Sequence, residues 1–555
     1  MRKGQAKSAL LADKATKMNH RHYNKVEVSP GPCPPEEFAG RFDERKQLLA
    51  ILSEVKKRGQ VVVVSGARGS GKTSFLDWAE YEIQDKSGGL GSPVIKKAFL
   101  ETPGMIFATY KDLLTELRGH QKFSWFRKAL DNPNVRRSIE AVLGVLEGAS
   151  SVVGPGKLGV ELGFGITRGF LPAQMVQYSQ LLSSFLEVFR NLSKVLEDNR
   201  FITILCDDAQ WSSDPDFHLL KDLIRNLPRR IAFIVTFRLE TDYMEKYIKL
   251  RGELDRFGHK EIRLTAMTAD EVKDLATRRY CLSIDNPIAD FLSSKIGDPL
   301  CLVSCFNLLQ RRNLEPNLDN IQQILSDVVD PARCIYSELD EQWQGRVNSL
   351  CILHPPLPLP LIACMLGVEQ QDIVRLQDEL NQSFVFQRLG KQFYDFAHPS
   401  LREYRRKELP EGVLIGLHAK AARCFEALAD KLADKWSVVL ALAEHLFFGQ
   451  EYEKALELNL AIGDRLYDLF DFSSALLMTD RARTCAEKTN NKPMLAVALH
   501  QKGLILQSDF RFPDSLDAYN QSLAIKREIG DESGEAVSLR TIKALKEKMG
   551  KKKGK

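Results

Sequence analysis

The densest group of chemistry-bearing residues lies early in the chain and fits the pattern G-x-x-x-x-G-K-[ST]. Its glycines let the backbone fold into a nest whose N–H groups surround a phosphate, and a following helix adds the positive end of its dipole. The lysine can reach the β- and γ-phosphates, and the hydroxyl after it can bind Mg²⁺. We therefore expect ATP or ADP with Mg²⁺ to bind here. The residues are Gly66, Ala67, Arg68, Gly69, Ser70, Gly71, Lys72 and Thr73, followed by Ser74.

Two carboxylates, Asp207 and Asp208, follow the apolar run 201–206. We expect Asp207 to hold Mg²⁺, mostly through water, and Asp208 to orient or deprotonate the water that attacks the γ-phosphate. The alternative is that both belong to an Asp-rich cap of the helix that starts near Pro215. Because the chain also has the phosphate-binding pattern, we favour the nucleotide-site interpretation.

A third candidate, Arg238, follows the apolar run 231–237. Open α/β sheets bind their ligands beyond the carboxyl ends of the strands, which is where this side chain is expected. There it can sense the γ-phosphate. A surface ion pair is the alternative.

The elements that must position these residues alternate between strand and helix. Residues 61–65, 201–206 and 231–237 read as buried strands, and residues 73–83 as a helix. Such alternation predicts an α/β fold with a parallel sheet covered by helices. A long insert separates the first two of these strands; its first part has a helical pattern, and residues 144–169 are rich in glycine.

The pattern becomes helical from Thr268, which is expected to cap a helix over 268–280. Residues 340–409 read as three helices followed by a hairpin, the order of a winged helix-turn-helix. Beyond residue 411 small residues recur about 40 positions apart, which is the size of a two-helix repeat. The pairs are Gly463 with Gly503, Ala475 with Ser515, and Ala482 with Ser522.

Composition limits the class of protein. The chain of 555 residues is 44% hydrophobic and 27% charged, as in multidomain globular proteins, and its net charge of +5 is too small to indicate nucleic-acid binding. No apolar run is long enough to span a bilayer, and we find no signal peptide. Ten cysteines without paired C-x-x-C spacing predict reduced thiols and a cytoplasmic protein.

Five short motifs lie in order between residues 38 and 409. They are F-A-G-R-F-D-E at 38–44, D-D-A-Q-W at 207–211, T-F-R at 236–238, G-D-P-L at 297–300, and F-A-H-P at 396–399 followed by L-R-E at 401–403. Together they resemble the entry motif, Walker B, sensor 1, G-x-P and winged-helix elements of the STAND signal-transduction ATPases. These belong to the AAA+ superfamily, and the likeness is to its maltose-regulator-like and Orc-like members.

The resemblance implies roles for three further residues. Arg41 and Pro299 would lie near the base and ribose, and His398 would touch the β-phosphate and stabilise an ADP-bound closed form. A structural histidine that caps a helix at Pro399 is the alternative for His398. The chain departs from the family because we find no DNA-reading domain after the repeats and no effector module at the front. The output of such a switch is therefore not named.

We expect six segments along the chain. They are a basic N-terminal segment and linker (1–35), a P-loop AAA+/STAND ATPase domain (36–267), a helical lid (268–335), a winged-helix domain (336–410), tetratricopeptide-like helical repeats (411–545) and a basic tail (546–555).

Three functions fit these segments. The first is an ATP-binding signal-transduction switch with slow ATPase activity, whose repeats bind a protein partner and which can form a nucleotide-dependent homo-oligomer. The second is a DNA-associated AAA+ ATPase of the origin-recognition type. Its recognition helix should be basic, but residues 369–380 contain Glu369, Asp372, Asp378 and Glu379 against Arg375 alone, so we favour the switch. The third is a tetratricopeptide scaffold with a structural nucleotide.

Overall fold

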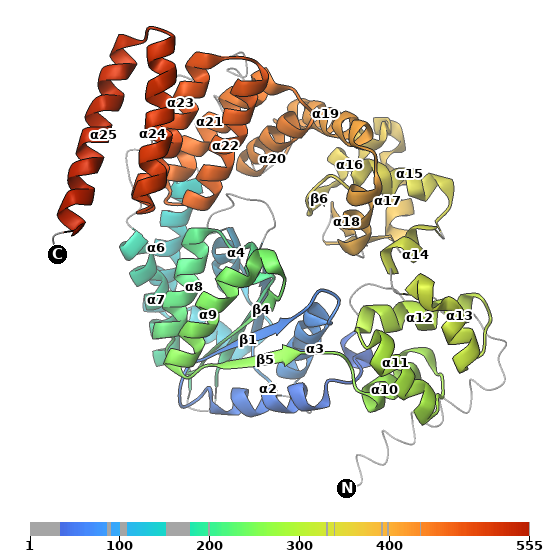
Figure 1. Cartoon of the computed structure of the whole chain (residues 1–555). Coiled ribbons are helices and arrows are strands. Elements are labelled where there is room, and N and C mark those ends of the chain that lie inside the picture. The colour runs from blue at the N-terminus through green and yellow to red at the C-terminus, as the bar shows by residue number, and fades with distance from the viewer. Residues whose placement is uncertain are drawn as a thin grey trace.

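A computed structural model describes residues 34–85, 90–99, 108–150, 178–197, 200–328, 331–337, 339–383, 385–389, 392–396, 399–432 and 435–553. The chain passes through an α/β unit, a helical lid, a mixed unit with a small sheet, and a long helical arm. These parts follow one another around a ring, and the arm returns to the α/β unit (Figure 1). The expected N-terminal basic segment (to residue 33) and most of the glycine-rich insert lie outside the described residues.

A parallel sheet of five strands, in the order β2-β3-β4-β1-β5, forms the centre of the α/β unit. Both faces of the sheet are covered: Val61 and Val63 pack into one apolar core, and Val62 and Val64 into the other. The predicted α/β fold is thus confirmed. The strands are β1 (Gln60–Gly66), β2 (Val94–Ala98), β3 (Ile202–Asp207), β4 (Ile231–Arg238) and β5 (Lys260–Leu264).

Strands β2 and β5 were not expected from the sequence. They lie at the two edges of the sheet and carry charged residues, including Lys96 and Lys97 in β2 and Arg263 in β5. Edge strands tolerate such residues because one side of the strand is not paired, so the apolar signal that reveals a central strand is weak.

Helices cover both faces of the sheet (Figure 1). Helices α2 and α3 contribute to one core, and α4 to α9 to the other. Their bounds are α2 (Phe42–Glu54), α3 (Lys72–Gln84), α4 (Ala108–Gly119), α5 (Ser124–Leu130), α6 (Pro133–Ser150), α7 (Tyr178–Val195), α8 (Asp214–Asn226) and α9 (Met244–Phe257). Short 3₁₀ turns occur at Pro35–Glu37, Ala209–Trp211 and Thr241–Tyr243.

The helical lid follows β5 and begins with the predicted cap. The Thr268 hydroxyl accepts from the Glu271 amide, and the Glu271 carboxylate accepts from the Thr268 amide, which is a complete capping box. The lid helices pack around their own apolar core. They are α10 (Ala269–Tyr280), α11 (Asn286–Ile296), α12 (Pro299–Arg311), α13 (Leu318–Val328) and α14 (Pro331–Ser337).

The mixed unit has the expected three helices followed by a hairpin, and it also has a short strand β6 and a fourth helix α18 after the hairpin. Strand β8 pairs antiparallel with both β6 and β7. The elements are α15 (Glu341–Leu350), β6 (Leu357–Pro358), α16 (Leu359–Leu366), a 3₁₀ turn (Gln370–Asp372), α17 (Ile373–Gln382), β7 (Phe386–Arg388), β8 (Phe393–Phe396) and α18 (Pro399–Glu408).

A disulfide corrects the expectation that all cysteines are reduced. Cys364 on α16 and Cys424 on α19 (Glu411–Leu428) are joined with an S–S distance of 2.09 Å. The residues are 60 positions apart, and only the packing of α16 against α19 brings them together, so spacing alone could not reveal the pair. The cytoplasmic location stays a prediction.

The helical arm, residues 411–553, is strongly periodic. From residue 450 on, the turns that join its helices have a residue with positive φ at positions 450, 470, 490, 510 and 530, one every 20 residues. This matches the predicted 40-residue spacing of helix pairs. After α19 the arm comprises α20 (Lys435–Phe448), α21 (Tyr452–Asp468), α22 (Phe472–Lys488), α23 (Lys492–Ser508), α24 (Phe512–Glu528) and α25 (Glu532–Lys553).

Close packing explains the small residues of the arm. A Cβ added to Gly503 would lie 2.5 Å from the Tyr519 ring, and one added to Gly463 would lie 2.8 Å from the Thr479 hydroxyl. Helix α25 continues to Lys553 and so includes most of the predicted basic tail, because lysine is a good helix former. In the described part of the chain, no helix is long and apolar enough to cross a membrane.

Candidate functional site

The phosphate-binding loop joins β1 to α3. Gly69 and Gly71 have φ values of 82° and 87°, which few other residues adopt, and Gly71 is the N-cap of α3. The loop therefore turns its amides toward the space in front of the helix N-terminus, where a phosphate is favoured. Lys72 donates from Nζ to the carbonyl oxygens of Gly66 at 3.0 Å and Ala67 at 2.7 Å.

Burial and the nearby Arg238 charge lower the pKa of Lys72 to about 8. A buried ammonium is stabilised by any anion that enters beside it. The loop thus has the electrostatic character of an anion site, and an incoming phosphate would raise the pKa of this lysine.

Asp207 lies at the end of β3 and faces the first turn of α3. The Thr73 hydroxyl donates to its Oδ2 at 2.8 Å, and the Thr236 hydroxyl at the end of β4 donates to Oδ1. Burial first, and then the charge of Asp208, raise the pKa of Asp207. Thr73 and Asp207 together present hard oxygen donors on one spot, which is the donor set that Mg²⁺ prefers.

Asp208 is held by hydrogen bonds with strand β4 and with the 3₁₀ turn Ala209–Trp211. It has a φ of 57°, and its backbone N–H donates to the Thr236 hydroxyl at 2.7 Å. Its Oδ1 accepts from Gln210 Nε2 at 2.7 Å and from Arg238 Nε at 3.2 Å. Gln210 also accepts, through Oε1, from the Arg238 amide at 3.1 Å. The candidate base and the candidate γ-phosphate sensor are therefore ion-paired.

Arg238 is held from a second direction by an aromatic ring. Its guanidinium carbon lies 5.6 Å from the centre of the Trp211 ring, within the range of a cation–π interaction. The side chain is thus placed between a carboxylate and an aromatic face at the carboxyl edge of the sheet.

Three other parts of the chain reach the loop. Arg41 donates from Nη2 to the Ser70 carbonyl oxygen at 2.9 Å. From the lid, Asp298 lies so close that a Cβ on Gly69 would be 2.7 Å from its Oδ1, and a Cβ on Gly71 would be 3.8 Å from Pro299 Cγ.

The third contact comes from the mixed unit. Glu403 on α18 forms an ion pair with Arg68, which is part of the phosphate-binding loop. The two residues are 335 positions apart. The loop is therefore in contact with the α/β unit, the lid and the mixed unit together.

Most predicted site residues lie together in the structure. The loop residues, Asp207, Asp208, Arg238, Arg41 and Pro299 surround one space, with Ser74 one position further along α3. His398 lies outside the described residues, so its role stays a prediction. Sequence reasoning assigned no role to Thr236, Gln210, Asp298 and Glu403, although all four lie within quoted motifs.

Unsatisfied polar atoms show that the loop fits a phosphate ligand. Arg68 Nη2 and Ser70 Oγ are buried without a hydrogen-bond partner among the described residues. Buried donors normally have partners, so these two favour a polar ligand at the loop.

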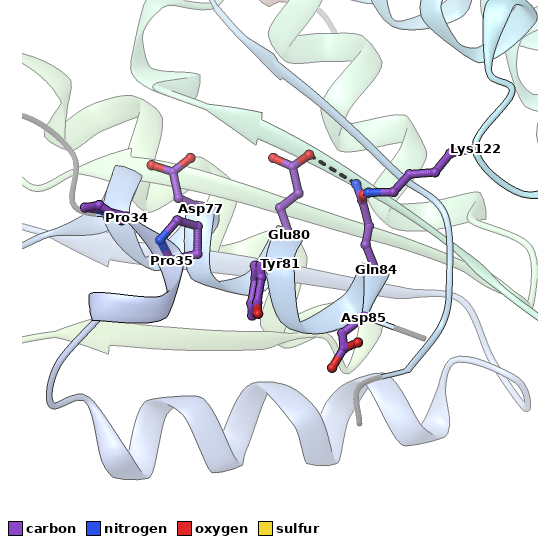
Figure 2. A pocket seen from close by; sticks show the side chains of 8 residues that line it. All are labelled: Pro34, Pro35, Asp77, Glu80, Tyr81, Gln84, Asp85 and Lys122. Carbon is purple, nitrogen blue, oxygen red and sulfur yellow. Dashed lines mark hydrogen bonds between the residues drawn. The ribbon is translucent and has the colours of Figure 1, made fainter. Parts of the chain in front are cut away.

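A separate pocket lies at the far end of α3 (Figure 2). It has a volume of about 550 Å³ and is lined by Pro34, Pro35, Asp77, Glu80, Tyr81, Gln84, Asp85 and Lys122. Its carboxylates repel phosphate, and burial raises the pKa of Glu80. The pocket is therefore no alternative nucleotide site.

Residues 37–235 match the family model described as an AAA ATPase domain. The chain contains an AAA ATPase domain. The match agrees with the AAA+ ATPase domain expected from the sequence, and it covers the loop and both carboxylates of the site. Arg238, Asp298 and Glu403 lie beyond the matched residues. No curated protein matches the chain.

Several solved structures are remotely similar to the chain that carries this AAA ATPase domain. A STAND protein with a tetratricopeptide repeat sensor from Pyrococcus horikoshii is 14% identical, with 95% of this chain and 76% of that chain covered and a TM-score of 0.35. The ORC2 protein of Aeropyrum pernix, in ADPNP–ADP complexes, is 12% identical, with 69% and 94% covered and a TM-score of 0.31. A RuvB variant from Thermotoga maritima is 14% identical, with 69% and 100% covered and a TM-score of 0.29.

Proposed function

We propose that this protein is a nucleotide-dependent signal-transduction switch of the STAND type. It binds ATP or ADP with Mg²⁺, hydrolyses ATP slowly, and uses its helical arm to bind a protein partner. One observation carries the proposal: the phosphate-binding loop contacts the lid through Asp298 and the mixed unit through Glu403. A ligand in that loop therefore acts on the positions of three units.

Each residue of the site has a role in this proposal. The loop amides and Lys72 bind the β- and γ-phosphates, and Arg41 and Pro299 lie on the side of the base and ribose. Thr73 and Asp207 hold Mg²⁺, which supplies neutralisation of the phosphate charge. Asp208 orients the attacking water and accepts its proton.

The ion pair between Arg238 and Asp208 connects recognition of the γ-phosphate to activation of the attacking water. While Arg238 is ion-paired with Asp208, its guanidinium occupies Oδ1 of that carboxylate, which an attacking water would otherwise contact. A γ-phosphate offers the guanidinium a stronger partner and so frees Asp208. His398 stabilises the ADP-bound form, as the family resemblance implies. The same proposal includes a helical lid at residues 268–335 and a winged-helix domain at residues 336–410.

Calorimetry and solution scattering test the switch. The full chain is expected to bind ATP and ADP, and its radius of gyration is expected to differ between the two complexes. Size-exclusion chromatography with each nucleotide separates a change of shape from formation of a homo-oligomer. Identical scattering and elution with ATP and with ADP would leave only a scaffold with a structural nucleotide.

Binding to DNA is the competing function and has less support. Helix α17, in the recognition position, has its Glu379 ion-paired to Arg346 of α15 and to Arg375 of α17, so both arginines are engaged within the unit. Fluorescence anisotropy with duplex DNA is expected to show only weak, salt-sensitive binding.

A further inference from the structure

The arm returns to the AAA ATPase domain at a point where two helix N-termini meet. Ser473, in the first turn of α22, donates its backbone N–H to Oδ2 of Asp214, the first residue of α8, at 3.0 Å. The first N–H groups of a helix have no acceptor within that helix. Asp214 therefore caps a helix that begins 258 positions later in the chain and closes the ring seen in Figure 1.

Asp471, the N-cap of α22, is enclosed by this contact. Its Oδ1 accepts from the Ser474 amide at 3.3 Å, but its Oδ2 has no hydrogen-bond partner among the described residues, although the residue is 0% exposed. An ionised carboxylate with a buried, unpaired oxygen is costly. A protonated carboxyl keeps the cap through Oδ1 and has no charge to solvate.

The surroundings of Asp471 also favour the neutral form. Burial is the largest cause, and the Asp214 charge adds to it; together they raise the pKa of Asp471 to about 6, against the opposing effects of Ser474 and Lys246. Lys246 donates to the Ser212 carbonyl oxygen at 2.5 Å, so it is only partly available to Asp471. The charged and titratable groups that face this contact are Asp214, Asp216 and His218 on α8, Glu245, Lys246 and Lys249 on α9, and Asp509 after α23.

We propose that the junction of α22 with α8 is a proton-controlled latch between the helical arm and the AAA ATPase domain. One proton, held on Asp471 beside Asp214, keeps the arm docked, and its loss loosens the arm.

The direction of the pH effect follows from linkage. In the docked form the pKa of Asp471 is raised to about 6 by burial and by the Asp214 charge. Undocking takes Asp214 away, so the pKa falls toward the ordinary aspartate value, and the docked form holds the proton more tightly than the free arm does. The stabilisation of the docked form is complete below the pKa of the free arm, and it is lost as the pH rises through the pKa of the docked form. The docking constant is therefore expected to be about ten-fold larger at about pH 5 than at about pH 7.5.

Hydrogen exchange in the nucleotide-free full chain measures docking at the junction. The Ser473 amide is expected to lose about ten-fold in protection, after correction for intrinsic exchange, between about pH 5 and about pH 7.5. Solution scattering is expected to show the ring opening over the same range. A parent protein whose protection does not change, or increases with pH, would overturn the proposal.

Two variants distinguish Asp471 from other titrating groups. Asp471→Asn imitates the protonated form and is expected to keep the arm docked at every pH in the range. Asparagine is a suitable cap here, because Asn491 has the equivalent position at the start of α23 and accepts from the Met494 amide at 3.1 Å. Asn491→Asp, at the opposite edge of the arm, is the matched control and should leave the pH dependence of the parent unchanged.

A third variant tests how the charge of Lys246 affects protonation of Asp471. Lys246→Met removes the cation that opposes protonation of Asp471, so the midpoint of the opening transition is expected to move to higher pH. If Asp471→Asn titrates like the parent, or the midpoint moves to lower pH in Lys246→Met, the latch is wrong. Because no nucleotide is present, these results are independent of whether the proposed ATPase switch is correct.

Discussion

The nucleotide site and the helical arm are built in opposite ways. The site is held by single polar contacts between distant segments, such as Arg68 with Glu403 and Asp208 with Arg238. The arm is held by regular helix pairs whose glycines allow close apolar packing, as at Gly503 against Tyr519. A few polar contacts can be exchanged for contacts with a ligand at little cost, whereas interlocked side chains cannot. The proposed switch requires this difference: a site whose contacts can change when a ligand binds, and an arm that moves as one body.

The largest effect is expected for a variant that removes the proposed catalytic base and keeps the geometry of the site. Asp208→Asn preserves an acceptor for Gln210 and Arg238 but cannot take a proton from water. ATP turnover is expected to fall about 100-fold or more, while ATP affinity is kept or increased, as measured by phosphate release and calorimetry. Turnover at the parent rate would mean that another group acts as the base.

The next largest effect is expected for a variant that removes the positive charge of the phosphate-binding loop. Lys72→Ala deletes a buried ammonium beside the phosphates, and ATP affinity is expected to fall by about 10- to 100-fold. Calorimetric titration checks this, with Lys249→Ala as a control because Lys249 is exposed on α9 and paired with Glu245. Equal ATP affinity in the parent and the Lys72 variant would contradict the phosphate-binding role of the loop.

A packing change should affect the arm and leave the site intact. Gly503→Ala places a methyl group against the Tyr519 ring and is expected to destabilise the arm by about 1–3 kcal/mol. Gly416→Ala, within α19, meets nothing within 4 Å and should be neutral or stabilising. Urea denaturation followed by circular dichroism measures both variants, and equal stability would show that the arm can repack at this point.

The smallest effect concerns the ion pair across units. Glu403→Gln removes a carboxylate that competes with phosphate for Arg68, so ATP affinity is expected to rise about three- to five-fold, since a partly exposed pair contributes up to about 1 kcal/mol. Glu408→Gln, exposed on the same helix, is the control. A fall in ATP affinity would mean that Glu403 supports the site instead of competing with its ligand.

The sequence predicted the local part of the site and much of the fold. The loop between β1 and α3 and the carboxylates after β3 depend on short strand–loop–helix patterns, and the Thr268 cap depends on residues three positions apart. Central strands were found because they are apolar on both faces. Edge strands β2 and β5 were missed because their charged residues hide that pattern.

Contacts over long sequence distances could not be predicted. Glu403 meets Arg68 across 335 positions, and Cys364 meets Cys424 across 60, so neither has a local signal. Both pairs depend on how whole helices pack, which one sequence does not determine by inspection. Asp298 is an intermediate case, because its motif was noted but its place beside Gly69 needs the lid in position.

The turn at every twentieth residue restricts how the arm can change its length during evolution. Successive helices are antiparallel, so the turns at 470 and 510 lie on the edge that meets the AAA ATPase domain, and those at 450, 490 and 530 lie on the other. A duplication or deletion of one 20-residue helix ahead of α22 would present the wrong edge and separate Ser473 from Asp214. Only whole pairs of 40 residues keep the orientation, and those added beyond α25 leave the junction untouched. Related chains whose arms differ in length ahead of α22 are therefore expected to differ there by multiples of about 40 residues.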